Sequence, residues 1–138
     1  MRTQRILFFG FLLWALAAGP SAALFAQSSA PTTPPASLKI DAPALAEYVA
    51  GHLGAYVLVD VRSREEYSSG HIPTAINIPY TEIALSPPTT DSQALIILYC
   101  SSGNRANAAR AALTRIGYTR VVNFGSLSQW TGEVESEK

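Results

Sequence analysis

The sequence predicts an α/β fold, in which a small parallel sheet is covered by helices on both faces to give three layers. Two continuous apolar and β-branched runs, residues 56–61 and 94–99, are typical of strands that are buried on both faces. Segments with helical spacing and capping residues alternate with the strands, and this alternation favours parallel pairing. With 138 residues and a hydrophobic content of 48%, the chain can form one domain with a full core.

The first half of the domain is predicted from its capping residues. A helix is expected at 41–49, capped by the aspartate at its start. The strand at 56–61 follows this helix. Ser63 and Glu66 then match a capping box, which opens a short helix. Gly70 is expected to end that helix.

The second half begins with three short elements: a strand stopped by a proline, one helical turn and a surface loop, at 75–78, 81–85 and 86–91. The strand at 94–99 then delivers Cys100 at its carboxyl end. A helix over 104–116 follows, and Gly117 closes it. Its inward face is expected to hold Ala109, Leu113 and Ile116. A fourth strand and a last turn complete the domain, at 121–123 and 127–130.

The first 26 residues have the order that is typical of a secretory signal peptide. Two arginines precede an uncharged apolar stretch of about a dozen residues, and small residues follow up to Ala26. We therefore expect cleavage after Ala26, with Ala23 as the alternative, and a periplasmic or secreted protein that is not inserted in a membrane after cleavage. An uncleaved N-terminal anchor is the competing interpretation. The remaining boundaries are a flexible Ser/Thr/Pro linker, a folded domain and a charged tail, at 27–37, 38–134 and 135–138.

Charge and composition exclude two classes of function. Loss of the signal removes two of the ten basic residues and none of the ten acidic ones, which leaves a net charge of −2. No basic cluster remains to neutralise phosphates, so we expect no nucleic-acid partner. The two histidines, His52 and His71, and the single cysteine cannot form a His/Cys metal site. We expect neither a metal nor another cofactor.

Cys100 is the candidate reactive residue. Ligands of parallel sheets bind beyond the carboxyl ends of the strands, where Cys100 lies. Residues 101–105 would surround its sulfur with backbone N–H groups, and the following helix would add its positive end, so the thiol pKa should be lowered. Gly103 permits a tight loop, and Arg105 can bind a second anionic group. A buried, inert Cys100 and an Arg105 paired with a surface carboxylate are the plainer alternatives.

The run Cys100-Ser101-Ser102-Gly103-Asn104-Arg105-Ala106 resembles the active-site loop of the rhodanese family, Cys-x-x-Gly-x-Arg-Ser/Ala. The resemblance extends over about 38–130. A second signature lies upstream of the loop and consists of Asp60-Val61-Arg62, Glu66-Tyr67, Gly70-His71-Ile72-Pro73 and 75–79. Downstream, Gly117-Tyr118 and Val121-Val122 match the closing strand of the family. The sequence is similar to small exported rhodaneses of the phage-shock type. Thr74 and Ser126 depart from the pattern, since the family commonly has glycine at both places.

The resemblance implies a rhodanese fold and a thiosulfate sulfurtransferase. Sulfane sulfur would pass from a small-molecule donor, typically thiosulfate, through a persulfide on Cys100 to cyanide, a thiol or a thiol protein. Arg105 would bind the donor's sulfonate, beside the substrate-binding residues Ser101, Ser102, Gly103 and Asn104. We expect Asp60, Arg62 and His71 to support the active-site loop, because attack by a thiolate needs no general base.

Two other functions compete with sulfur transfer. Cysteine phosphatases and arsenate reductases surround a tetrahedral anion with a Cys-x5-Arg loop, whereas four residues separate Cys100 from Arg105 here. The shorter loop favours a persulfide over a phosphoryl group. A non-catalytic rhodanese-like binding module or sulfur carrier would have the same sequence features, so this alternative stays open.

Overall fold

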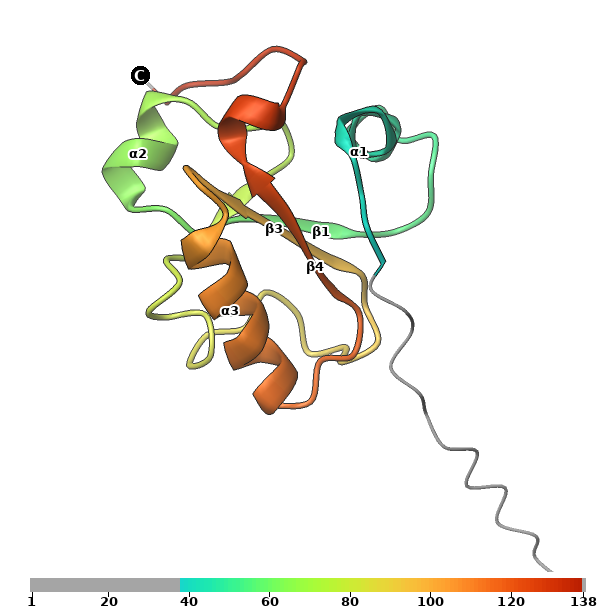
Figure 1. The fold of residues 1–138 in the computed structure, drawn as a ribbon, viewed down its shortest axis with the longest axis vertical. Coiled ribbons are helices and arrows are strands. Elements are labelled where there is room, and N and C mark those ends of the chain that lie inside the picture. Colours follow the sequence, from blue (N-terminus) through green and yellow to red (C-terminus); the bar gives the residue numbers. More distant parts are fainter. Residues whose placement is uncertain (1–37, 138) are drawn as a thin grey trace, which may run out of the picture. The chain divides into compact units, whose positions relative to one another are not determined.

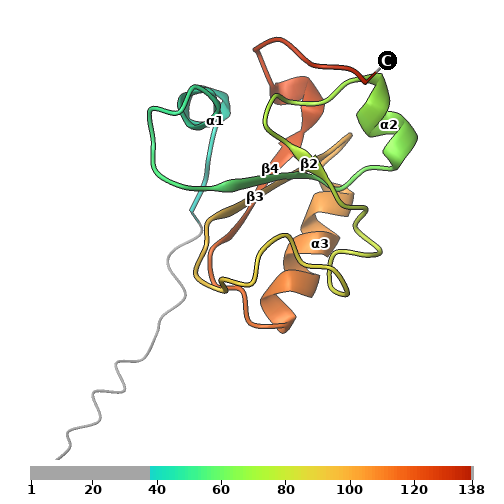
Figure 2. The same ribbon diagram turned by 180° about the vertical axis from the view of Figure 1, so that it is seen from behind.

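The computed structural model describes residues 38–137, and its four-stranded sheet is parallel throughout. The strand order is β2-β1-β3-β4, for β1 (Val57–Asp60), β2 (Ile76–Asn77), β3 (Ile96–Cys100) and β4 (Val121–Ser126). The helices are α1 (Ala42–Val49), α2 (Arg64–Ser69), α3 (Asn104–Arg115) and the 3-10 helix η1 (Leu127–Gln129). Figures 1 and 2 show α3 and α1 on opposite sides of the sheet. The predicted α/β class is confirmed.

Alternation along the strands divides the core into two apolar clusters. On one face of the sheet, Tyr99 and the buried side chains of β1 and β4 that point the same way pack against α1, α2 and η1. Leu98 and Cys100 point to the other face, where they pack against Ala106, Ala109 and Leu113 of α3. All five residues of β3 are buried, because this central strand is covered on both faces. Cys100 therefore lies beneath the first turns of α3.

The predicted capping residues start both N-terminal helices. The Asp41 carboxylate accepts a hydrogen bond from the Ala44 N–H at 3.0 Å, at the start of α1. At the start of α2, the Ser63 hydroxyl accepts from the Glu66 N–H at 3.3 Å, and the Glu66 carboxylate accepts from the Ser63 N–H at 3.0 Å. Gly70 is the C-terminal cap of α2, as expected. The capping box sets the position of Glu66 at the N-terminal end of α2.

A strained turn leads from α2 into β2. Ile72 accepts a hydrogen bond from the Ala75 N–H at 3.1 Å, with Pro73 and Thr74 at the two central positions of the turn. Thr74 has a φ of 71°, in the left-handed region that a type II turn requires of its third residue and that favours glycine. Its hydroxyl is hydrogen-bonded to that of Tyr56 at 2.8 Å. The departure from the family pattern at Thr74 therefore creates local backbone strain.

Two expectations about the C-terminal half are wrong. Ile116 does not face the core: it is the C-terminal cap of α3 and is 46% exposed, because the helix ends at Arg115. The fourth strand extends to Ser126 rather than ending at Asn123. It is longer because β3 continues to Cys100 and pairs with Gly125 and Ser126, which the sequence of β4 does not mark as strand residues.

The charged tail packs against α2. His71 and Glu135 exchange two backbone hydrogen bonds, at 2.8 and 2.9 Å. The Glu137 carboxylate accepts from the guanidinium of Arg64 at 2.8 Å and from the hydroxyl of Ser68 at 2.9 Å. The expected signal peptide and linker, 1–26 and 27–37, lie outside the described residues. No helix within 38–137 is long and apolar enough to cross a membrane.

Candidate active site

Cys100 ends β3, and the loop after it folds back over the sulfur. The Gly103 N–H donates a hydrogen bond to the Cys100 sulfur at 3.0 Å. Gly103 is the N-terminal cap of α3 and has a φ of 88°, and no side chain forms a capping hydrogen bond with this helix. A Cβ at Gly103 would lie 3.4 Å from the Cα of Gly125, which leaves little room for a side chain. The loop therefore needs glycine here both for its φ and for its packing.

The electrostatics of the loop favour a thiolate. Burial of Cys100 raises the pKa of its thiol, but hydrogen bonds from four backbone N–H groups of the loop and first turn outweigh burial and lower the pKa below its ordinary value. The donors belong to Ala106, Ser102, Gly103 and Arg105. Cys100 is fully buried, as in the inert alternative, yet its sulfur is surrounded by polar donors. The expected direction of the pKa shift is confirmed.

Arg105 lies at the rim of the loop in a bidentate ion pair with Glu66. Its two terminal nitrogens donate to the Glu66 carboxylate oxygens at 2.6 and 2.8 Å, and one of them also donates to the Ser101 hydroxyl at 2.8 Å. The hydrogen bond with Arg105 lowers the pKa of Glu66 to about 2. Conversely, the pKa of Arg105 is raised, mainly by Glu66, and the Cys100 sulfur contributes to the rise. The guanidinium thus lies close to both the carboxylate and the sulfur.

Glu66 is a residue whose contact with the site the sequence interpretation missed, because the sequence assigned it a structural role only in the capping box. Its carboxylate has two functions, since one oxygen accepts from Ser63 while both oxygens accept from Arg105. The pairing of Arg105 with a carboxylate had been the plainer alternative, and the structure contains it. A guanidinium next to a buried thiol needs a counter-charge, and this need was the available signal.

Asp60 and Arg62 form a buried ion pair next to the strand that carries Cys100. The buried Asp60 carboxylate accepts from the Arg62 guanidinium at 2.6 to 3.0 Å, and Arg62 also donates to the Gly70 carbonyl at 2.6 Å. The Arg62 guanidinium lies 5.8 Å from the ring centre of Tyr99, the residue before Cys100. These contacts link α2 to β3. Their connection to the loop is therefore indirect, through the strand that carries Cys100.

His71 belongs to the packing of α2 and the tail. Its ring stacks on that of Tyr67 with centres 3.8 Å apart, and its Nδ1 donates to the Tyr67 carbonyl at 2.9 Å. Its Nε2 lies 3.8 Å from the Glu135 carboxylate. All of these contacts are on the α2 side, so His71 acts on the loop at most through α2.

Two polar residues of β4 form hydrogen bonds with the backbone of the active-site loop. The Asn123 amide donates to the Gly103 carbonyl at 3.0 Å, and the Ser126 hydroxyl donates to the Ser101 carbonyl at 2.5 Å. Ser102 and Asn104 of the same loop are exposed. Of the residues expected to bind substrate, Ser101 to Arg105 form one continuous rim. The sequence identified Ser126 as a departure from a pattern but not as a contact of this loop.

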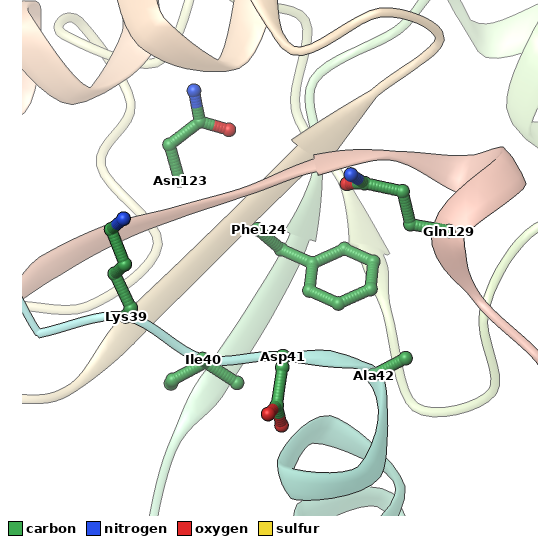
Figure 3. Close-up of a pocket in the computed structure, with 7 residues that line it drawn as sticks. All are labelled: Lys39, Ile40, Asp41, Ala42, Asn123, Phe124 and Gln129. Atoms are coloured by element: carbon green, nitrogen blue, oxygen red, sulfur yellow. The ribbon is translucent and has the colours of Figure 1, made fainter.

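A separate pocket of about 410 Å³ lies beside β4. Figure 3 shows its lining, which comes from the segment before α1, from β4 and from η1: Lys39, Ile40, Asp41, Ala42, Asn123, Phe124 and Gln129. Neither Cys100 nor Arg105 lines it. Asn123 connects it to the loop, and the Oδ1 of this residue has no hydrogen-bond partner within 38–137. The pocket is therefore distinct from the candidate active site at Cys100.

Residues 41–133 match the family model of the rhodanese-like domain. The chain belongs to the rhodanese family. The thiosulfate:glutathione sulfurtransferase of Saccharomyces cerevisiae is 39% identical over 88 residues, which cover 54% of this chain and 63% of that protein. The thiosulfate sulfurtransferase PspE of Escherichia coli is 35% identical over 71 residues, which cover 50% of this chain and 68% of PspE.

The solved structures agree with the family assignment. A structure titled "rhodanese with anions from E. coli" has a TM-score of 0.53 and 32% identity to this chain, and the match covers 59% of this chain and 99% of that one. The protein thus has the rhodanese fold that the loop signature predicted. Because the match spans only 63% of the yeast relative, the activity of that whole protein is not transferred to this chain.

Proposed function

We propose that this rhodanese is a thiosulfate sulfurtransferase, which carries sulfane sulfur on Cys100 as a persulfide. The observation that carries the proposal is the ring of backbone N–H groups directed at the Cys100 sulfur, one of which lies at 3.0 Å. Donors that converge on one point, held by a strand and a helix, stabilise negative charge without rearranging during the reaction. Such a cradle suits both the thiolate and the terminal sulfur of a persulfide.

The proposed reaction consists of two displacements at sulfur. The Cys100 thiolate attacks the outer sulfur of thiosulfate; the new S–S bond forms as the old one breaks, and sulfite leaves with the bonding electron pair. An acceptor thiolate, or cyanide, then attacks the outer sulfur of the persulfide. Cys100 leaves as a thiolate, and the acceptor departs as a persulfide or as thiocyanate. Electrons balance without an external oxidant, and no proton needs to be removed.

Arg105 has hydrogen-bonding capacity left for the donor. A guanidinium has five N–H donors, of which the bonds to Glu66 and Ser101 use three. The Nε N–H and the second N–H of Nη1 remain on opposite edges of the guanidinium, so one of them can bind a sulfonate oxygen of thiosulfate and stabilise the departing sulfite. The Glu66 pair keeps the guanidinium at the rim, so that it need not be ordered by the substrate.

The phosphatase alternative is disfavoured by the same loop. Four residues separate Cys100 from Arg105, and the sulfur already accepts from the third of them, Gly103. A cradle closed this tightly around one sulfur leaves less room for a tetrahedral phosphoryl group than a five-residue loop does.

Mass spectrometry of the intact protein tests the sulfur-transfer proposal. Protein stripped of sulfur by cyanide is incubated with thiosulfate, and we expect the wild type to gain one sulfur atom that a second cyanide treatment removes. Cys100→Ser should gain none, and Ser86→Ala, at an exposed residue outside the active-site loop, serves as a control that keeps the nucleophile. A wild type that stays unmodified while it hydrolyses a phosphate ester would refute the assignment.

A pair of donors tests the role of Arg105. Arg105→Ala should slow persulfide formation from thiosulfate more than from an uncharged organic persulfide, because only thiosulfate presents a sulfonate. Equal losses with both donors would show that Arg105 serves the structure of the loop alone.

We also propose that the protein is exported, on the basis of the basic, apolar and small residues at 1–26. Fractionation of cells that produce the full chain, followed by N-terminal sequencing, tests this. A mature protein that begins at Gln27 outside the cytoplasm is expected. A full-length chain found in the cytoplasm would contradict export.

A further inference from the structure

Ser126 lies beside Cys100 because of an irregularity in the sheet. β3 and β4 pair Leu98 with Asn123, but the next pair is Tyr99 with Gly125, and Cys100 then pairs with Ser126. One extra residue of β4 is accommodated at this point, as in a β-bulge. With uninterrupted register, Cys100 would pair with the glycine, and no hydroxyl would reach the loop. The bulge therefore selects which residue of β4 faces the active-site loop.

The direction of the hydrogen bonds around Ser126 follows from chemistry. The Ser101 carbonyl can only accept, so the single proton of the Ser126 hydroxyl is donated to it, at 2.5 Å. The Ser126 oxygen then accepts from the Ser128 N–H at 3.1 Å and from the Ser128 hydroxyl at 2.8 Å. The backbone N–H of Ser126 is bound by the Gln129 side chain at 3.1 Å. Ser126 is thus held by η1 and holds the loop.

Fixing the Ser101 carbonyl also fixes a donor to the sulfur. The carbonyl of Ser101 and the N–H of Ser102 belong to one planar trans peptide, in which they point in opposite directions. Ser126 binds the carbonyl end of this peptide. The Ser102 N–H at the other end belongs to the backbone groups that lower the pKa of Cys100, beside the Gly103 N–H that donates to the sulfur at 3.0 Å. Within 38–137, Ser126 provides the only hydrogen bond to the Ser101 carbonyl. Rotation of the peptide would break both bonds together.

We propose that Ser126 is a positioning residue for sulfur transfer, whose hydroxyl orients the Ser101–Ser102 peptide so that its N–H faces the Cys100 sulfur. This inference rests on the proposed function, since it assigns a role in the same site. The neighbouring Gly103 carbonyl is held differently, by two donors, the Asn123 amide at 3.0 Å and the Asn107 N–H at 2.9 Å. The Ser101 peptide depends on one hydroxyl, so a single substitution can release it.

The measurement is a pH titration of the Cys100 thiolate by its ultraviolet absorbance, with Cys100→Ser as the blank. Cys100 is the single cysteine of the chain, so the signal is unambiguous. In Ser126→Ala the midpoint should move to higher pH, by the equivalent of about a tenfold change in the acid dissociation constant, which is the lower end of the range for one hydrogen bond to a charged group. Arg105, the charged group beside the sulfur, is unchanged in every variant.

Matched variants distinguish a positioning effect of the Ser126 hydroxyl on the Cys100 thiolate from a general loss of protein stability. Ser126→Thr keeps a hydroxyl on an extended backbone, with φ −100° and ψ 143°, and should restore the wild-type midpoint. Ser128→Ala removes a neighbouring hydroxyl in η1 and should leave the midpoint unchanged. Ser126→Gly, which also lacks the hydroxyl, should match Ser126→Ala. A wild-type midpoint in both Ala and Gly variants, or equal shifts in Ser126→Ala and Ser128→Ala, would overturn the proposal.

The titration also separates this inference from the proposed function. It needs no sulfur donor, so it can succeed even if the wild type forms no persulfide with thiosulfate. If persulfide forms on Cys100 but the titrations of all variants coincide, sulfur transfer stands and the role of Ser126 fails.

Discussion

Replacing Glu66 by glutamine tests the ion pair that holds Arg105 at the rim of the site. The carboxylate accepts from both terminal nitrogens of the guanidinium, at 2.6 and 2.8 Å. It also closes the capping box of α2 by accepting from the Ser63 N–H at 3.0 Å, and a glutamine oxygen can do the same. Glu66→Gln therefore removes the charge and keeps the helix cap, whereas Glu66→Ala removes both.

The magnitude follows from the pKa of Glu66. The hydrogen bond with Arg105 lowers this pKa from an ordinary 4.5 to about 2, against the opposing effect of burial. A difference of about 2.5 corresponds to about 3.4 kcal/mol between the folded and unfolded states. The Glu66 side chain is 37% exposed, so solvent screening reduces the contribution of the pair to about 1 kcal/mol. We expect Glu66→Gln to lose that amount at pH 7, and Glu66→Ala to lose about 1 kcal/mol more with the cap.

The sign of the pH dependence makes this test specific. Because the folded-state pKa lies below the unfolded one, the stabilisation is complete above about pH 4.5 and is lost as the pH falls toward 2. Urea unfolding of the wild type and of Glu66→Gln at pH 7 and pH 3 should show a difference in unfolding free energy that is less than half as large at the lower pH. Equal stability at pH 7, or the same difference at both pH values, would refute the reasoning.

Three further substitutions test the support of the site and the core. Asp60→Asn leaves the buried Arg62 guanidinium without its counter-charge, so urea unfolding should show a loss of about 3–5 kcal/mol; a loss below about 1 kcal/mol would contradict the role of this pair. Thr74→Gly relieves a residue at φ 71° and should raise the free energy of unfolding by about 1 kcal/mol, whereas Thr74→Ala, which keeps the strain, should give no gain. Leu113→Ala should lower the free energy of unfolding by about 2–5 kcal/mol in the same assay, because Leu113 is fully buried on the face of α3 that packs against the sheet. A loss of about 0.5 kcal/mol or less would show that the cluster around Cys100 repacks freely.

The elements that the sequence predicted best are those defined by short-range signals. The caps at Asp41, Ser63 and Gly70 act within about one helical turn, and the structure contains all three. The continuous apolar run ending at Cys100 likewise identified the central strand, because only a strand covered on both faces tolerates five consecutive buried residues. Ile116 was misplaced for the complementary reason: helical spacing continues beyond the point where the helix ends, and spacing alone does not mark the end.

The order of the elements, the position of Cys100 at the end of a buried strand and the glycine in the loop after it are determined by the sequence alone, since they depend on neighbouring residues. The partners of that loop were decided only by the tertiary structure. Glu66 and Arg105 are 39 residues apart, and Ser101 and Ser126 are 25 apart. Their contacts depend on how α2 and β4 lie against β3, and for Ser126 on one extra residue in the register of the sheet. A shift of one residue exchanges the two faces of a strand, so no local pattern could identify these partners.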